Sequence, residues 1–276
     1  MAKGERGGKR KSSMTSGRPR IPTQNADLST SAQSVHDLAE FLHRNYGGRL
    51  DESTLSKMDY KTLWTQVEGI EEVYKAFPEL KPLMKSDRAS VNRIRVSGNN
   101  SGQNTYASMN MTGNLNIGNA IRKHKDIASL MKSYENDVSV GFHPKGTNAS
   151  HISSHEVGHM MVMLVKNAEG GAYTGKYWGS DTAKSIVHNA WNSPEMKQVR
   201  KQYKANHGRQ LTIKEAQGHI SRYGAQNHHE TVAEAVAQFS AIGNNSPTFT
   251  RAIVNELRTR MISATSTNNS KRAMVP

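Results

Sequence analysis

The sequence predicts an α+β fold in which helices dominate and a small mixed sheet is formed near the middle of the chain. Apolar residues recur every three or four positions in several long segments, which is the period of an amphipathic helix. Between residues 91 and 118 the pattern changes to short apolar runs separated by Asn and Gly, which is typical of strands and turns. With 276 residues, the chain can form one sizeable domain with extensions.

The region before residue 88 is expected to be helical, with helices over 34–46 and 59–76 followed by Pro78 and Pro82 as helix breakers. Each helix has an apolar stripe that we expect to be buried. These residues are Leu38, Phe41, Leu42, Leu63, Trp64, Val67, Ile70 and Val73.

A zone of strands is expected next, at 94–96, 105–109 and 115–117, then a helix over 121–134 and an edge strand over 138–142. A glycine-rich loop is expected over 170–180. The remaining helices are expected at 182–191, 194–206, 212–221, 228–239 and 247–261. In this division, residues 1–30 form a basic disordered tail, 31–88 a helical segment, 89–262 the main domain and 263–276 a second disordered tail.

The pentapeptide His155-Glu156-Val157-Gly158-His159 is the most informative motif. On a helix, His155 and His159 are four residues apart and face the same side, so both imidazoles can reach one metal ion. Zinc accepts two imidazoles and a carboxylate and leaves one position open for water. Glu156 can then act as general base on that water. The motif predicts a zinc-dependent hydrolase, and a degenerate helix without metal is the alternative.

The sequence around the motif favours the metal. Thr147, Asn148 and Ser150 offer helix caps before it, and an apolar run over 160–165 follows it. Ionisable groups on such an apolar helix are costly to bury unless they are paired or bind a metal. A metzincin is excluded, because it would need glycine at position 162 and histidine at position 165, where this chain has Val162 and Val165.

The third ligand is expected on the helix predicted over 228–239. Glu230 and Glu234 are four residues apart and share a face of it. A bare pair of carboxylates on this apolar, alanine-rich helix would repel each other, and a cation or an imidazolium would relieve that repulsion. His228 and His229 are alternative ligands. Consecutive helix residues differ by about 100° in direction, so His229 and Glu230 are not expected to bind one ion together.

The two segments together resemble the gluzincin metallopeptidases. The similarity is closer to the catalytic domain of anthrax lethal factor and its relatives, in which a Tyr precedes the ligand Glu by seven residues, as Tyr223 precedes Glu230 here. Similar domains occur in bacteriophage head or virion-associated proteins. The resemblance covers about residues 90–245 and implies a zincin-like domain. One departure is that Thr231 and Val232 occupy positions that are often aromatic in the family.

The resemblance implies His155, His159 and Glu230 as zinc ligands. It further implies Glu156 as the base, Tyr223 as a hydroxyl that stabilises the oxyanion, and Glu234 as a carboxylate that holds a ligand histidine. Each role has a physical basis, because a ligand imidazole usually donates its other N–H to a carboxylate, and a developing oxyanion needs a fixed donor. Tyr223 as a core tyrosine is the alternative.

Two more histidines lie near the motif. His151 shares the helix face of His155 but lies about 12 Å along the axis from His159, too far for both to bind one zinc. We expect His151 to be a partly exposed residue at the helix start, with a role facing the substrate or behind the ligands as the alternative. His143 is expected to be solvated.

The net charge is +14, and residues 1–25 hold seven Lys or Arg against one Glu. This tail predicts contact with nucleic acid or another polyanion, with a solvated tail as the alternative. A second basic stretch runs over 197–214. No transmembrane span, secretory signal or cysteine is present, so we expect no membrane partner and a cytoplasmic or virion-associated location.

A protein or peptide substrate is expected, because an edge strand over 138–142 beside the metal can pair with an extended peptide. The alternative function is a structural or assembly protein, such as a phage virion component with assembly partners, whose metal site is vestigial or stabilising. The general base Glu156 favours the enzyme, because a structural site needs no base.

Overall fold

The structure is a computed structural model that describes residues 31–85, 91–98, 105–170 and 180–272. It has an α+β architecture, as the sequence predicts. The longer helices are α1 (Ser31–Tyr46), α3 (Tyr60–Ala76), α6 (Ile127–Ser139), α7 (His151–Ala168), α8 (Ser180–Trp191), α9 (Pro194–His207), α10 (Ile213–Ile220), α11 (His228–Ile242) and α12 (Thr248–Arg272). The short ones are α2 (Glu52–Leu55), α4 (Leu80–Met84), α5 (Asn119–Arg122) and a 3₁₀ turn, Gly243–Asn245.

The strands form one small mixed sheet in the order β1-β2-β4-β3. They are β1 (Arg49–Leu50), β2 (Arg95–Gly98), β3 (Ala107–Met109) and β4 (Asn114–Ile117). β2 is parallel to both β1 and β4, and β3 is antiparallel to β4. The three predicted strand regions are confirmed, and β1 is an addition that the sequence did not signal.

The two predicted N-terminal helices are confirmed. The side chain of Asp59 accepts a hydrogen bond from the Thr62 amide at 2.8 Å and starts α3. All the apolar stripe residues named for these helices are buried. They belong to the same core as the apolar residues of α7 and α11, and β1 pairs with β2 across the boundary expected near residue 88. Among the described residues, this boundary therefore does not separate two cores.

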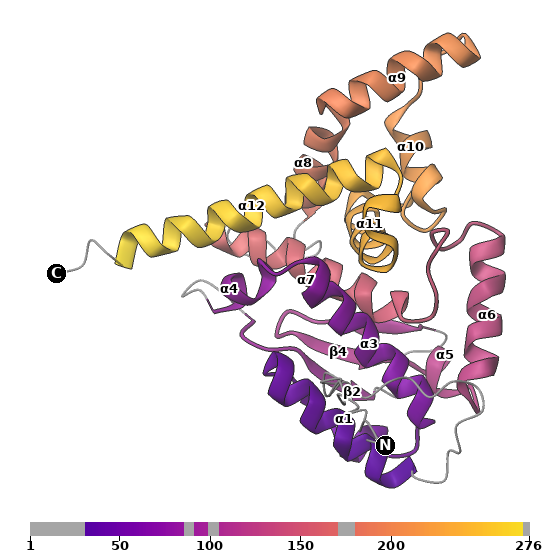
Figure 1. Cartoon of the computed structure of the whole chain (residues 1–276), viewed down its shortest axis with the longest axis vertical. Coiled ribbons are helices and arrows are strands. Elements are labelled where there is room, and N and C mark those ends of the chain that lie inside the picture. Colours follow the sequence, from indigo (N-terminus) through magenta and orange to yellow (C-terminus); the bar gives the residue numbers. More distant parts are fainter. Residues whose placement is uncertain (1–30, 86–90, 99–104, 171–179, 273–276) are drawn as a thin grey trace, which may run out of the picture.

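The two helices α7 and α11 form the most extensive helix pair of the fold, and α3 packs on both. Figure 1 shows them near the middle of the molecule, with the sheet and α1 below and with α8, α9 and α10 above. The close contact between α3 and α7 depends on Gly69, where a Cβ atom would meet the Ser150 carbonyl oxygen. The His-containing helix is thus enclosed by helices that are distant in sequence.

The helix expected over 121–134 is divided in two. α5 ends at Arg122, and Asp126 starts α6 by accepting a hydrogen bond from the Ser129 amide at 2.8 Å. A capping aspartate favours a fresh helix start at this point, and apolar periodicity alone does not reveal it.

The prediction of an edge strand over 138–142 is wrong. α6 continues to Ser139 and closes with Gly141 at φ 72°, the left-handed conformation that favours glycine. The Phe142 amide donates to the Asp137 carbonyl at 2.8 Å and the Gly141 amide to the Val138 carbonyl at 3.0 Å. This pair of hydrogen bonds is the Schellman motif of a helix C-terminus. The alternation of Val138, Val140 and Phe142 thus results from a helix end and not from a pleated strand.

The remaining predicted helices are present, with differences at their ends. α12 extends to Arg272, past the expected end at 261, so the expected C-terminal tail begins within a helix. The N-terminal tail, residues 1–30, and most of the glycine-rich loop expected over 170–180 lie outside the described residues. Among the described helices, none has the length and apolar character needed to cross a membrane.

Candidate metal centre

Gly158, in the middle of the histidine motif, lets α7 and α11 approach closely. A Cβ atom at this position would lie 2.9 Å from Ala233 Cα and 3.2 Å from Val236 Cβ. Real Cβ contacts are rarely so short, so only glycine fits without displacing the partner helix. The close approach brings side chains of α11 within reach of the histidines of α7.

The first cluster consists of His155 and His159 from α7 and Glu230 from α11. Glu230 Oε2 lies 3.0 Å from His155 Nε2 and 3.2 Å from His159 Nε2. For a tetrahedral zinc with ligands at about 2.0–2.1 Å, neighbouring ligand atoms are about 3.3 Å apart. Glu230 Oε2 thus lies at nearly the spacing that one zinc ion requires from each of the two ring nitrogens, and all three ligand atoms are within 4.8 Å of one another. The structure brings together the three residues for which the sequence predicts metal binding.

The charges of the cluster are strongly coupled. Burial alone would lower the pKa of His155, but the neighbouring carboxylates of Glu230 and Glu234 outweigh it and raise that pKa to about 10. Burial alone would raise the pKa of Glu230, yet the nearby imidazoles of His155 and His159 hold it well below its usual value. The two carboxylates therefore attract positive charge to the site. A proton on His155 supplies this charge in the absence of a metal ion.

Glu234 lies behind the first cluster, where the resemblance implies a residue that holds a ligand histidine. Its Oε1 is 2.8 Å from His155 Nδ1, the ring nitrogen that does not face Glu230. Glu234 is completely buried, and the neighbouring histidines hold its pKa well below its usual value, although burial itself acts in the opposite direction. The lowered pKa favours the ionised carboxylate, which can accept a hydrogen bond from the His155 N–H.

Backbone hydrogen bonds place Tyr223 beside the first cluster. The amides of Arg222 and Tyr223 donate to the carbonyls of Gly141 and Phe142 at 2.8 and 3.2 Å, so the end of α6 fixes the segment before α11. The Tyr223 ring centroid is then 5.5 Å from that of His155. Burial and, to a smaller extent, the nearby carboxylates raise the pKa of Tyr223 far above its usual value. Its hydroxyl therefore stays protonated and remains a donor.

Glu156 is half-buried and lines a cavity of about 240 Å³. The other lining residues come from β3 and the chain before it, the loop after α6, α7, the segment before α11, and α11 itself: Thr105, Tyr106, Ala107, Phe142, His143, His151, Ile152, His155, Tyr223 and Glu234. The predicted base, one predicted ligand and the predicted oxyanion donor thus face one concave space.

The alternative ligands His228 and His229 point elsewhere. The His229 ring stacks on that of His159, with centroids 4.3 Å apart and planes at 7°, and does not join the ligand atoms. Burial lowers the pKa of His229 to about 3, so this ring is neutral and acts as a wall of the site. His228 lies beside His188, with ring centroids 5.4 Å apart. The geometry favours Glu230 as the residue of α11 that faces the two histidines.

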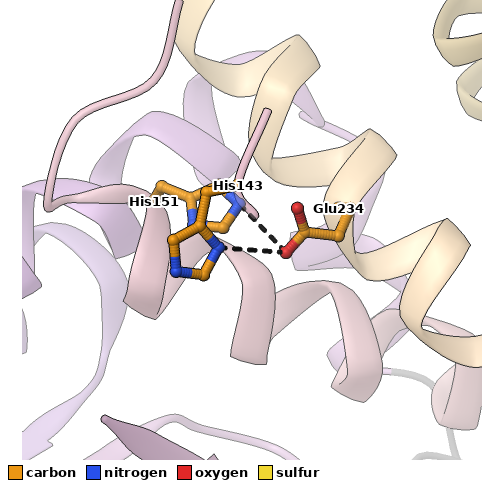
Figure 2. Close-up of side chains that lie close together, drawn as sticks. All are labelled: His143, His151 and Glu234. Atoms are coloured by element: carbon orange, nitrogen blue, oxygen red, sulfur yellow. Dashed lines mark ion pairs between the residues drawn. The ribbon is translucent and has the colours of Figure 1, made fainter. Parts of the chain in front are cut away.

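A second cluster consists of His143, His151 and Glu234, and two of its residues are more buried than their sequence context predicts (Figure 2). His151, expected to be partly exposed, is 2% exposed, and His143, expected to be solvated, is 6% exposed. Both expectations are wrong because α6, the loop after it and α11 fold over the first turn of α7. Burial lowers the pKa of His151 to about 4, so this imidazole is neutral.

Comparisons with protein-family models, with curated proteins and with solved structures give no match. The resemblance to gluzincins therefore rests on the motifs of this sequence, and the chemistry of the site rests on its own geometry. The structure adds two groups of histidine and glutamate side chains that could hold a metal ion: His143, His151 and Glu234 are all buried, whereas His159 and Glu230 of the first group are partly exposed.

Proposed function

We propose that this protein is a zinc-dependent metalloendopeptidase with a zincin-like fold. The observation that carries the proposal is the convergence of His155, His159 and Glu230, with ligand atoms near the spacing of a tetrahedral zinc site. Two imidazoles and a carboxylate suit zinc among the divalent metals and leave one position for water. Glu156 on the adjoining cavity supports catalysis over a purely structural site.

The roles of the residues follow from their positions. Zinc, when bound, supplies a Lewis acid that acidifies a water molecule and polarises a carbonyl. Glu156 accepts the proton from that water and passes it to the leaving amine. Tyr223, whose hydroxyl stays protonated, donates a hydrogen bond to the oxygen that gains negative charge. Glu234 orients His155 by facing its Nδ1.

The position of β3 supports a peptide substrate. This strand can take the pairing role that was expected of a strand over 138–142. In the part of the chain that the structure describes, β3 is an edge of the sheet. The Gly118 amide donates a hydrogen bond to the Tyr106 carbonyl, and the Asn110 amide donates one to the Asn114 carbonyl. In an antiparallel pair, residues that bond to the opposite strand alternate with residues whose N–H and C=O point away from it. Ala107, next to Tyr106, is of the second kind, so its backbone groups face away from β4. Since Ala107 lines the cavity, an extended peptide can pair there and hold its carbonyl near Glu156.

The test compares wild type, Glu156→Gln and the control Glu135→Gln, an exposed glutamate of α6. Each protein is loaded with excess zinc, desalted and incubated with unfolded casein. We expect cleavage by wild type and the control, and a rate lower by about 10²–10⁴-fold in Glu156→Gln, the typical contribution of a general base. Zinc content should be equal in all three. Wild type that binds zinc but cleaves neither casein nor a mixture of unfolded peptides would favour the structural or assembly protein.

A further inference from the structure

The second cluster, His143, His151 and Glu234, is formed by three segments that are separate in sequence. His143 lies in the loop after α6, His151 is the first residue of α7, and Glu234 is in the middle of α11. Their exposed fractions are 6%, 2% and 0%. Figure 2 shows both imidazoles on one side of the carboxylate, with a dashed line from one ring nitrogen of each to it. The fold has therefore buried a carboxylate beside two histidines that are not ligands of the first cluster.

Hydrogen bonds do not satisfy the polar atoms of this cluster. Within the described residues, both ring nitrogens of His143, both of His151 and both oxygens of Glu234 lack a hydrogen-bond partner. Buried polar atoms are nearly always paired, and a buried carboxylate in particular is costly to leave unpaired. One ring nitrogen of each histidine and one oxygen of Glu234 lie within 4.8 Å of one another, so a single ion can bind these three atoms.

The two imidazole rings are held in place by aromatic neighbours. Tyr134 stacks on His143 with ring centroids 4.8 Å apart and planes at 8°, and lies 5.6 Å from the ring of His151. The Tyr134 hydroxyl is itself 2.9 Å from Thr147 Oγ1. The rings are thus oriented by packing before any ligand arrives, which is the property of a preformed site.

The spacing is that of ligands around one ion. His151 Nε2 lies 3.3 Å and His143 Nδ1 3.7 Å from Glu234 Oε1. The ligand atoms of the three residues are all within 4.8 Å of one another. The edge of a tetrahedral zinc site is about 3.3 Å, and two imidazoles with one carboxylate repeat the donor set of the first cluster. All three residues also line the cavity, from which water can supply a fourth ligand.

We propose that His143, His151 and Glu234 bind a second divalent metal ion of the zinc class, beside the ion held by His155, His159 and Glu230. The two sites share a wall, because Glu234 Oε1 is also 2.8 Å from His155 Nδ1. A carboxylate oxygen has two lone pairs, so it can face the second ion and at the same time accept a hydrogen bond from His155 Nδ1–H. The second site thereby supports the first one without using its ligands.

The experiment counts zinc in untagged protein, because a histidine tag would bind zinc itself. Metal-free protein is loaded with excess zinc, desalted and analysed by mass spectrometry for zinc per chain. The variants are His143→Phe, which keeps a ring against Tyr134 but removes both nitrogens, and His159→Phe, which alters only the first cluster. The control is His219→Phe, an exposed histidine of α10.

We expect two zinc ions per chain in wild type and in the control, and one in each of the other variants. One ion in wild type and in His143→Phe, with none in His159→Phe, would overturn the second site and leave the first intact. One ion in wild type and in His159→Phe, with none in His143→Phe, would support the second site and overturn the first. A wild type without zinc would overturn both sites.

Folding of each variant is checked by circular dichroism. If His143→Phe does not fold, the wild type decides the question by titration with Co²⁺, followed by its visible absorption. Spectral changes that end at two equivalents support the second site. Changes that end at one equivalent, with the His159→Phe variant showing none, overturn it.

Discussion

Replacement of Gly158 by alanine tests the close packing that brings the two ligand helices together. The new Cβ atom would lie 2.9 Å from Ala233 Cα, which is backbone and cannot move without the whole of α11. Overpacking of this kind costs about 1–3 kcal/mol. The same change favours the helix by about 1 kcal/mol, because alanine has the higher helix propensity. The expected net loss of stability is therefore about 0–2 kcal/mol.

A matched control separates the two contributions. Gly218 lies in α10 with nothing within 4 Å of a Cβ atom, so Gly218→Ala changes propensity alone and should stabilise the protein by up to about 1 kcal/mol. Since propensity cancels in the comparison, Gly158→Ala should be about 1–3 kcal/mol less stable than Gly218→Ala. The assay is urea unfolding of the metal-free proteins, followed by circular dichroism. Equal stability of the two variants would refute the close approach of α7 and α11.

Three further results are expected at the first cluster. Glu230→Ala should weaken zinc binding in a competition assay by more than the 10- to 100-fold typical for loss of a residue behind the ligands, and unchanged affinity would shift the assignment to His228 or His229. Tyr223→Phe should slow peptide cleavage by about 10²–10³-fold at unchanged zinc content, and full activity would make it a packing residue. The pKa of His155 is raised to about 10 in the metal-free protein, and zinc binds only the neutral imidazole. Zinc affinity should therefore rise with pH up to about 10, by at most about tenfold per pH unit for one proton. If zinc binds at pH 8 without releasing a proton, His155 is not protonated in the metal-free protein.

Much of the fold could be predicted from local patterns. The buried stripes of α1 and α3 follow from helix periodicity, and the strands β2, β3 and β4 from short apolar runs between Asn and Gly turn residues. The errors occurred where a pattern has two interpretations. Alternating Val138, Val140 and Phe142 suggested a strand, but Gly141 in the left-handed conformation closes a helix there. The division between α5 and α6 was missed because Asp126 acts as a helix cap within a continuous apolar pattern.

The metal centre too could be predicted only in part from the sequence. The amino-acid sequence by itself determined that His155, Glu156 and His159 lie on one helix and that Glu230 and Glu234 share a face of another, because spacing along a helix sets direction. Only the tertiary structure decided that Glu230 and not His229 faces the two histidines of the motif. It also decided that Tyr223 is held beside them by the end of α6.

The second cluster depended on the tertiary structure entirely. His143 lies in a loop without periodicity, and His151 stands at a helix start that a local pattern describes as exposed. Their burial against Glu234 arises because α6, α7 and α11 pack together at Tyr134 and Gly158. The physical reason is the range of the interactions: hydrogen bonds within a helix act over four residues, whereas the packing that places one helix on another joins residues far apart in the chain.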